Sequence, residues 1–128
     1  MLRVRLLRVR AHAYATEDLE KVRRAVETAL APMEARPSIK YLEGYHGDRI
    51  AVLEYLIRDE GEAGRLLRDM VARLGPAGIG VEEKSKMGGV IHVRLDKQAA
   101  CRGVIRYGEM DAIKMEFSYE GDLREMLG

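Results

Sequence analysis

Hydrophobic and polar residues alternate near the beginning of the chain. Every second residue is apolar, namely Leu7, Val9, Ala11 and Ala13. The residues between and after them are polar and mostly basic, namely Arg8, Arg10, His12 and Tyr14. Because successive side chains of a β-strand point to opposite faces of the sheet, this pattern predicts a strand with one buried and one basic face. The doublet Leu6-Leu7 interrupts the alternation, and a β-bulge there would return Arg3 and Arg5 to the basic side.

Two amphipathic helices are indicated by apolar residues that recur every three or four positions. The first follows Thr16, a suitable N-cap residue, and its apolar stripe comprises Leu19, Val22, Val26, Ala29, Leu30 and Met33. The second is expected at residues 62–74, where Gly75-Pro76 ends it.

The segments between and after these helices predict strands and loops. Residues 38–46 and 49–58 are expected to form a hairpin, and the second of these strands is apolar on both parities, which is typical of the interior of a sheet. Residues 75–89 contain five glycines and no sustained period, so they predict a mobile loop.

The last third of the chain predicts a meander of three strands at residues 90–95, 101–107 and 111–119. A short closing helix is expected from Asp122. The element order is then β-α-β-β-α-β-β-β-α, which favours an α+β fold in which helices cover one face of a mostly antiparallel sheet. At 14.4 kDa, residues 1–128 are expected to form a single domain.

Basic residues are concentrated in two segments, although the whole chain has a net charge of only +1. Residues 1–14 contain four arginines and no acidic residue, and residues 84–106 contain six basic residues and one acidic residue, Asp96. If these segments meet in the folded protein, they form an anion-binding face. The scarcity of Asn, Gln and Cys beside 34% charged residues predicts a thermophilic source.

The chain is expected to be cytoplasmic. Its single cysteine cannot form an internal disulfide. Arginines interrupt the apolar N-terminal stretch every two or three residues, which argues against a signal-peptide core or a membrane span.

Three segments carry a resemblance to a known family: AHAYATEDLEKVRRAV at 11–26, LEGYHGDRIAVLE at 42–54 and VRLDKQAACRGVIR at 93–106. Together they resemble the archaeal exosome-associated RNA-binding family, whose fold is similar to that of the large-subunit ribosomal protein that binds 5S ribosomal RNA. The resemblance implies a non-catalytic RNA-binding protein, an accessory to the archaeal exosome or to ribosomal RNA metabolism.

Arginine suits such a role because its planar guanidinium binds phosphate oxygens in pairs and stacks on bases. The candidate RNA-binding residues are Arg8, Arg10, His12, His92, Arg94, Lys97, Gln98, Arg102 and Arg106. The alternative for the arginines is a set of cross-strand ion pairs with Asp96, Glu43, Glu54 or Glu116. Lys97 and Gln98 are expected to be free at the tip of a turn in which Asp96 bonds its own backbone.

Other residue types have structural as well as functional explanations. Tyr41, Tyr45 and Tyr107 could stack on bases, but tyrosine at strand positions is more often packed at the edge of a core. Cys101 is expected to be a buried, small apolar residue.

The sequence favours a binding protein over an enzyme. No two of its histidines have a metal-ligand spacing, and no carboxylate pair specifies hydrolysis, so we expect no metal and no cofactor. Two alternatives remain open: a protein-interaction subunit without direct RNA contact, and a small metal-dependent nuclease that uses His46 or His92.

Overall fold

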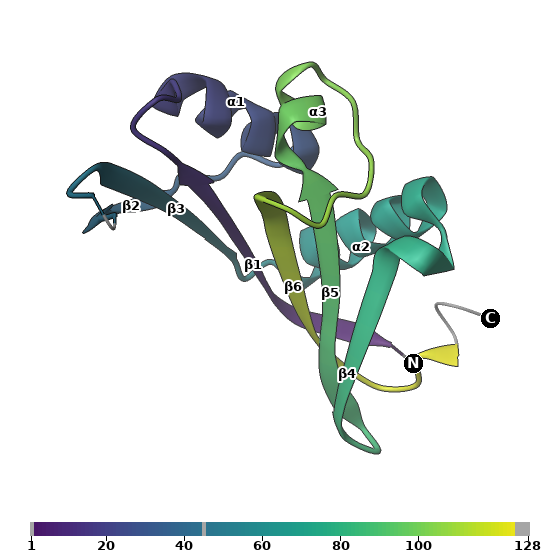
Figure 1. Ribbon diagram of the computed structural model, residues 1–128. Coiled ribbons are helices and arrows are strands. Elements are labelled where there is room, and N and C mark those ends of the chain that lie inside the picture. Colours follow the sequence, from purple (N-terminus) through teal and green to yellow (C-terminus); the bar gives the residue numbers. More distant parts are fainter. Residues whose placement is uncertain (1, 45, 125–128) are drawn as a thin grey trace.

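The computed structural model describes residues 2–44 and 46–124, and it consists of one six-stranded antiparallel sheet with helices on one side (Figure 1). The elements, in chain order, are β1 (Arg3–Ala13), α1 (Leu19–Leu30), β2 (Ser38–Glu43), β3 (Arg49–Ile57), α2 (Glu60–Leu74), the 3₁₀ helix η1 (Pro76–Gly78), β4 (Ile79–Ser85), β5 (Gly88–Asp96), α3 (Lys97–Cys101) and β6 (Ala112–Glu120). The strands lie in the order β2-β3-β1-β6-β5-β4. The predicted α+β class is confirmed.

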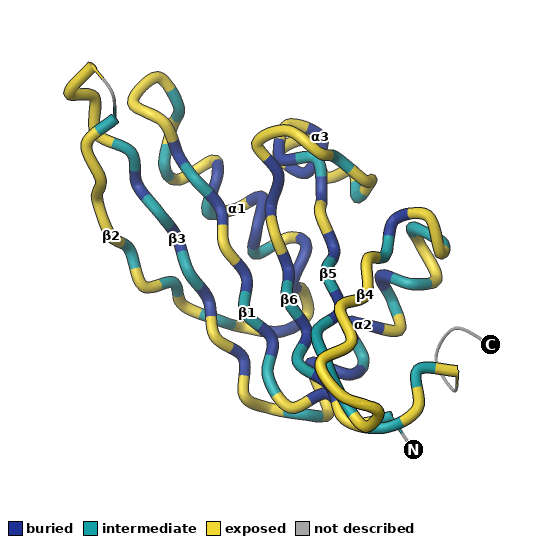
Figure 2. The backbone as a smooth tube through the Cα atoms, turned by 60° about the horizontal axis from the view of Figure 1, so that its bottom comes forward, coloured by how far each residue is buried: buried dark blue, intermediate teal, exposed yellow. Residues whose placement is uncertain are grey.

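The first strand buries its apolar residues and exposes polar ones on its other face, as the alternation predicts. Leu7, Val9 and Ala11 are fully buried, whereas Arg10 is exposed. The same alternation of buried and accessible positions runs along β3, β5 and β6 (Figure 2). Helices α1 and α2 pack against the buried side of β1, and we call the opposite side the open face.

A β-bulge near the start of β1 is also confirmed. The pairing of β1 with β6 shifts between Val4 and Leu6, and the extra residue allows Val4 and Leu7 both to reach the core. Arg3 and Arg5 stay exposed on either side of Val4. Each has an acidic partner, because Arg3 forms an ion pair with Glu60 and Arg5 forms one with Glu120 at 2.6 Å.

The helices begin and end at polar signals close to those expected. Asp18, and not Thr16, is the N-cap of α1, where its carboxylate accepts a hydrogen bond from the Glu20 N–H at 2.9 Å. The carboxylate of Asp59 caps α2 in the same way. Gly75 ends α2 with a φ of 72°, in the left-handed region that glycine adopts without strain.

The hairpin is confirmed as β2 and β3, and β3 is interior because it pairs with both β1 and β2. The prediction of a mobile loop at residues 75–89 is wrong, since these residues form η1, β4 and the beginning of β5. The sequence did not predict strand β4, because β4 is an edge strand that is exposed at nearly every position. It therefore lacks the alternation of apolar and polar residues that indicates a strand.

The predicted strand at residues 101–107 is also wrong. The chain turns into α3 directly after β5, because the Asp96 carboxylate accepts a hydrogen bond from the Ala99 N–H at 3.0 Å and so starts a helix. Of the predicted strand, only Tyr107 bridges to β5, opposite Leu95. The helix expected from Asp122 falls largely on residues 125–128, which lie outside the described residues. Within the described residues, no helix is long and apolar enough to cross a membrane.

Candidate nucleic-acid interface

Three cations lie side by side across the middle of the open face. The strand register places Arg10 of β1 opposite Lys114 of β6, and Lys114 opposite Arg94 of β5. All three side chains are exposed. We call these residues the cation row. Since neighbouring strands are about 4.8 Å apart, the row spans roughly 10 Å between the backbones of its outer members.

The cation row has little compensating negative charge. Arg10 bonds to Glu54 of β3, with 2.8 Å between Nη2 and Oε2, and this hydrogen bond lowers the pKa of the Glu54 carboxyl. Lys114 and Arg94 have no ion-pair partner within residues 2–44 and 46–124. Like charges directly opposite one another destabilise a sheet, so the arrangement is suited to an added anion.

A second cross-strand row lies next to the first and is more nearly balanced. Arg8 faces Glu116, which in turn faces His92 of β5. The Nε atom of Arg8 is buried and has no hydrogen-bond partner among the described residues. The Nε2 atom of His92 lies 3.6 Å from a carboxylate oxygen of Glu82.

His12 lies on the same face beyond Arg10 and opposite Val52. Burial lowers the pKa of its imidazole, and Lys114, Lys97 and Arg10 lower it further against the opposing effect of Asp111. His12 is therefore neutral at pH 7 and offers a ring or a hydrogen bond, not a charge, to a ligand.

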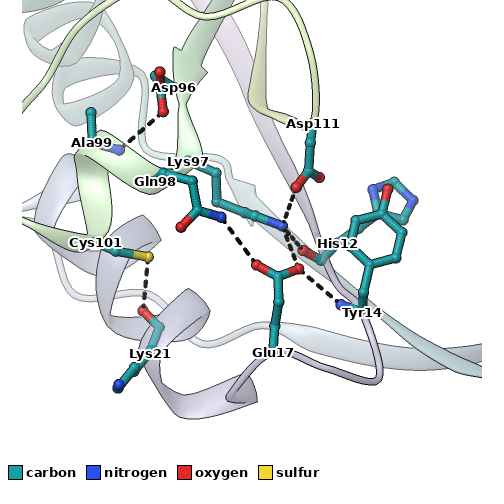
Figure 3. Close-up of polar contacts among 10 residues, drawn as sticks. All are labelled: His12, Tyr14, Glu17, Lys21, Asp96, Lys97, Gln98, Ala99, Cys101 and Asp111. Carbon is teal, nitrogen blue, oxygen red and sulfur yellow. Dashed lines mark hydrogen bonds and ion pairs between the residues drawn. The ribbon is translucent and has the colours of Figure 1, made fainter.

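The expectation that Lys97 is free at the tip of a turn is wrong. Its side chain is fully buried at the start of α3, where Nζ lies 2.7 Å from Glu17 and 2.6 Å from Asp111 (Figure 3). The same amine donates a hydrogen bond to the backbone oxygen of His12 at 2.8 Å. Burial alone would lower the pKa of Lys97, but the bonds to Asp111 and Glu17 outweigh it and raise this pKa.

The other candidates near α3 do not join the open face. Gln98 and Arg102 line a pocket of about 560 Å³ between α1 and α3, and the Gln98 amide donates to Glu17 at 3.4 Å. Arg106 lies in the connection to β6, 3.6 Å from Asp96. The open face therefore brings together five of the nine candidates, namely Arg8, Arg10, His12, His92 and Arg94.

A family model described as RNA binding matches residues 6–119 of this chain. The chain belongs to this RNA-binding family. RNA-binding protein PAB1135 of Pyrococcus abyssi is 30% identical over 112 residues, which are 80% of this chain and 73% of the relative. The region that the family model matches, residues 6–119, contains the whole cation row and all of α3.

Solved structures share the fold over nearly the full length. Mth689, a DUF54 protein from Methanothermobacter thermautotrophicus, superposes with a TM-score of 0.76 at 25% identity, covering 98% of this chain and 99% of its own. Protein SSO0741 from Sulfolobus solfataricus has a TM-score of 0.69 at 19% identity, covering 88% and 86%. These relatives are archaeal proteins.

Within this family fold, the explanation of the arginines by ion pairs is partly confirmed. Arg10 pairs with Glu54 and Arg106 approaches Asp96, as that explanation expects. Arg94, in contrast, has no acidic partner among the described residues and faces a lysine instead.

Sequence reasoning missed one member of the cation row and misjudged a cysteine. Lys114 lies between the buried residues Ile113 and Met115, a pattern typical of an exposed strand position, but only the pairing of β6 with β1 and β5 brings it between two arginines. Cys101 is exposed and not buried, because it lies at the end of α3. The interpretation of Asp96 as structural is confirmed by its N-cap bond to Ala99.

Proposed function

We propose that this protein binds RNA through the open face of its sheet, with the cation row holding phosphate groups and without catalysing a reaction. The observation that carries the proposal is the pairing of Lys114 with Arg94, two like charges that face each other and lack an acidic partner among the described residues. A phosphate oxyanion between them would relieve this repulsion. Residues 1–128 would act as one domain.

The remaining candidates divide by position. Arg8 and His92 flank the cation row and would extend the contact along the strands, while neutral His12 would contact a base or a ribose hydroxyl. Gln98, Arg102 and Arg106 lie outside the open face and would be reached only by a larger RNA. We do not include Lys97, since its amine is buried among protein partners.

The resemblance to the archaeal exosome-associated family suggests a setting for this activity. We propose that the protein acts in the cytoplasm as an accessory to the exosome or to ribosomal RNA metabolism, with a fold related to that of the 5S ribosomal RNA-binding protein. Membership in an RNA-binding family supports the RNA part of this proposal. Purification from the native source with and without ribonuclease would test the assembly: exosome subunits should co-purify, and their absence in both preparations would remove the accessory role.

The RNA-binding face can be tested by removing two charges. We expect Arg94→Ala/Lys114→Ala to weaken binding of a structured RNA, measured by fluorescence anisotropy over a range of salt concentrations. Each lost phosphate contact lowers the salt dependence of log K by about 0.7 to 0.9, so the double variant should lose about 1.4 to 1.8. Arg68→Ala/Arg73→Ala removes the same charge from α2, away from the open face, and is the matched control.

Two results would contradict the proposal. Equal affinities for the wild type and the Arg94→Ala/Lys114→Ala variant would show that the open face is not the RNA-binding surface. Cleavage of the RNA that requires a divalent metal would show that the protein is a nuclease. Within residues 2–44 and 46–124, no group of three His, Cys, Asp or Glu side chains could hold a metal ion.

A further inference from the structure

A hollow of about 270 Å³ lies at the end of the cation row, on the outer edge of β5. It occupies the gap between the beginning of β4 and the segment that returns from α3. Its lining includes Gly80, His92, Arg94 and Tyr107. Gly80 lies directly opposite His92 in the β4–β5 pairing, so a position that would otherwise carry a side chain over the open face is empty. The hollow is therefore continuous with the surface that carries the cation row.

The ring of Tyr107 is exposed but fixed in place. Tyr107 forms an isolated β-bridge with Leu95, and the next residue, Gly108, donates its N–H to the Arg94 carbonyl oxygen at 3.2 Å. The phenol hydroxyl donates to Glu109 at 2.9 Å, and 44% of the residue remains accessible. An aromatic ring that is accessible and already ordered loses little entropy when a flat ligand packs on it.

Arg94 and Tyr107 line the same hollow. The hydrogen bond to Glu109 raises the pKa of the Tyr107 phenol, and the positive charge of Arg94 acts in the opposite direction. Arg94 thus belongs to the cation row and to the hollow at once. One arginine can hold a phosphate or stack on a base, and here both kinds of contact are within reach of the same side chain.

We propose that this hollow receives an unpaired RNA base, which stacks on Tyr107 beside Arg94 while neighbouring phosphates lie along the cation row. The inference rests on the proposed function and adds the class of RNA: single strands, loops or ends, not continuous duplex. Bases within a duplex are stacked and paired and cannot enter such a hollow, whereas unpaired bases stack readily on aromatic and arginine side chains.

Another exposed tyrosine, Tyr41 of β2, is less suited to this role. Tyr41 lies on β2, at the opposite edge of the sheet from the hollow, so it cannot contact a base held beside Arg94. Its ring is already covered by the Arg49 guanidinium, 4.3 Å from the ring centre. Tyr45 lies outside the described residues. Tyr41 therefore provides a matched control for substitution of an exposed tyrosine.

The test compares three variants and the control Tyr41→Ala on two ligands. Tyr107→Ala removes the ring and Tyr107→Phe keeps it without the bond to Glu109. Gly80→Val places a side chain in the hollow. The backbone should tolerate it, because a Cβ atom at residue 80 would meet the His92 Cβ at 3.7 Å, an ordinary contact. The ligands are a single-stranded RNA that carries 2-aminopurine, whose fluorescence falls when it stacks, and a fully paired duplex of the same sequence.

We expect Tyr107→Ala to weaken single-strand binding by about 5- to 150-fold, the range for loss of one stacked base, and to abolish the fluorescence change. Gly80→Val should act in the same direction. Tyr107→Phe should lose much less affinity than Tyr107→Ala because it keeps the ring, and Tyr41→Ala should bind like the wild type. Duplex affinity should be unchanged in all four variants.

The inference would be overturned if Tyr107→Ala and Gly80→Val bound the single strand like the wild type. This result is distinct from failure of the proposed function, which would appear as unchanged affinity in the Arg94→Ala/Lys114→Ala variant. Equal losses on single strand and duplex would also overturn the inference, because they would show that Tyr107 does not read an unpaired base. Circular dichroism of each variant ensures that only folded protein is compared.

Discussion

Asp111 accepts a charged hydrogen bond from Lys97, with 2.6 Å between Oδ2 and Nζ. The two residues belong to different segments, since Lys97 begins α3 and Asp111 precedes β6. Glu17, just before α1, forms an ion pair with the same amine. The buried cation thus joins three segments that are far apart in the sequence, and Asp111 adopts a left-handed φ of 49° that few residues other than glycine tolerate as well as aspartate.

Replacing Lys97 by methionine should destabilise the protein without altering its RNA-binding surface. The variant Lys97→Met keeps the length of the side chain but leaves two carboxylates without their cation. Removal of one partner of a buried ion pair costs 3–5 kcal/mol, and we expect a value near the lower end, about 3 kcal/mol, because Glu17 and Asp111 are partly exposed.

Urea unfolding at pH 7 measures this loss, and Gln98→Ala, on the exposed neighbour, is the control, with an expected change within about 0.5 kcal/mol. Folded Lys97→Met should bind RNA like the wild type. A large loss of RNA affinity in the folded variant would mean that Lys97 has a direct role after all.

The same cluster should make the stability depend on pH in acid. Burial acts to raise the pKa of Glu17, but hydrogen bonds from Lys97, the Tyr14 N–H and Gln98 hold it below its ordinary value of 4.5. A carboxyl whose pKa is depressed on folding stabilises the protein above its unfolded pKa and loses this effect as the pH falls through the folded pKa. Urea unfolding between pH 6 and pH 3 should therefore show a steeper decline for the wild type than for Glu17→Gln; identical slopes would contradict this.

A charge reversal in the cation row should raise stability and abolish function together. In Lys114→Glu, the new carboxylate faces Arg10 on one side and Arg94 on the other, so repulsion becomes attraction. Opposite-charge pairs across strands contribute about 0.2 to 1 kcal/mol each, which sets the expected gain in the free energy of unfolding. RNA affinity should fall in the order wild type, Lys114→Gln, Lys114→Glu, while stability should rise in that order; parallel trends in the two quantities would contradict the assignment.

The single cysteine allows the position of bound RNA to be checked. Cys101 is exposed on α3, which packs against α1 in the helix layer, away from the cation row. A thiol-reactive dye should modify the folded protein at the same rate with and without saturating RNA. A cysteine introduced by Ser118→Cys on the open face should be protected by RNA. Protection of Cys101 alone would place the RNA on the helix layer instead.

The sequence predicted those parts of the fold in which local pattern and final environment agree. In β1, the alternation from Leu7 to Ala13 predicted both the buried and the open face, and in α1 and α2 the apolar stripes predicted which side packs on the sheet. Strand β4 could not be found in this way, because an edge strand that is exposed on most positions needs no apolar parity. Its pairing with β5 supplies what its composition does not.

The site was predicted only as far as it depends on single strands. The arginines of β1 and Arg94 were assigned to a basic face, and the structure places them there. The misplacement of Lys97 has a specific cause, since lysine is almost never fully buried unless it is paired. Its partners Glu17 and Asp111 lie 80 and 14 positions away in the sequence, so no local pattern announces the pairing.

The place of β6 in the sheet has a consequence for the making of this protein on the ribosome. Among the six strands of the sheet, β6 is synthesised after the other five, yet it lies between β1 and β5. Until β6 emerges, the other five strands can form only two partial sheets, whose unpaired edges can pair with other chains. Lys114 belongs to the same strand, so the cation row is completed only after β6 has been synthesised. A ribosome-bound intermediate should therefore be the form most prone to aggregate and the form least able to hold RNA.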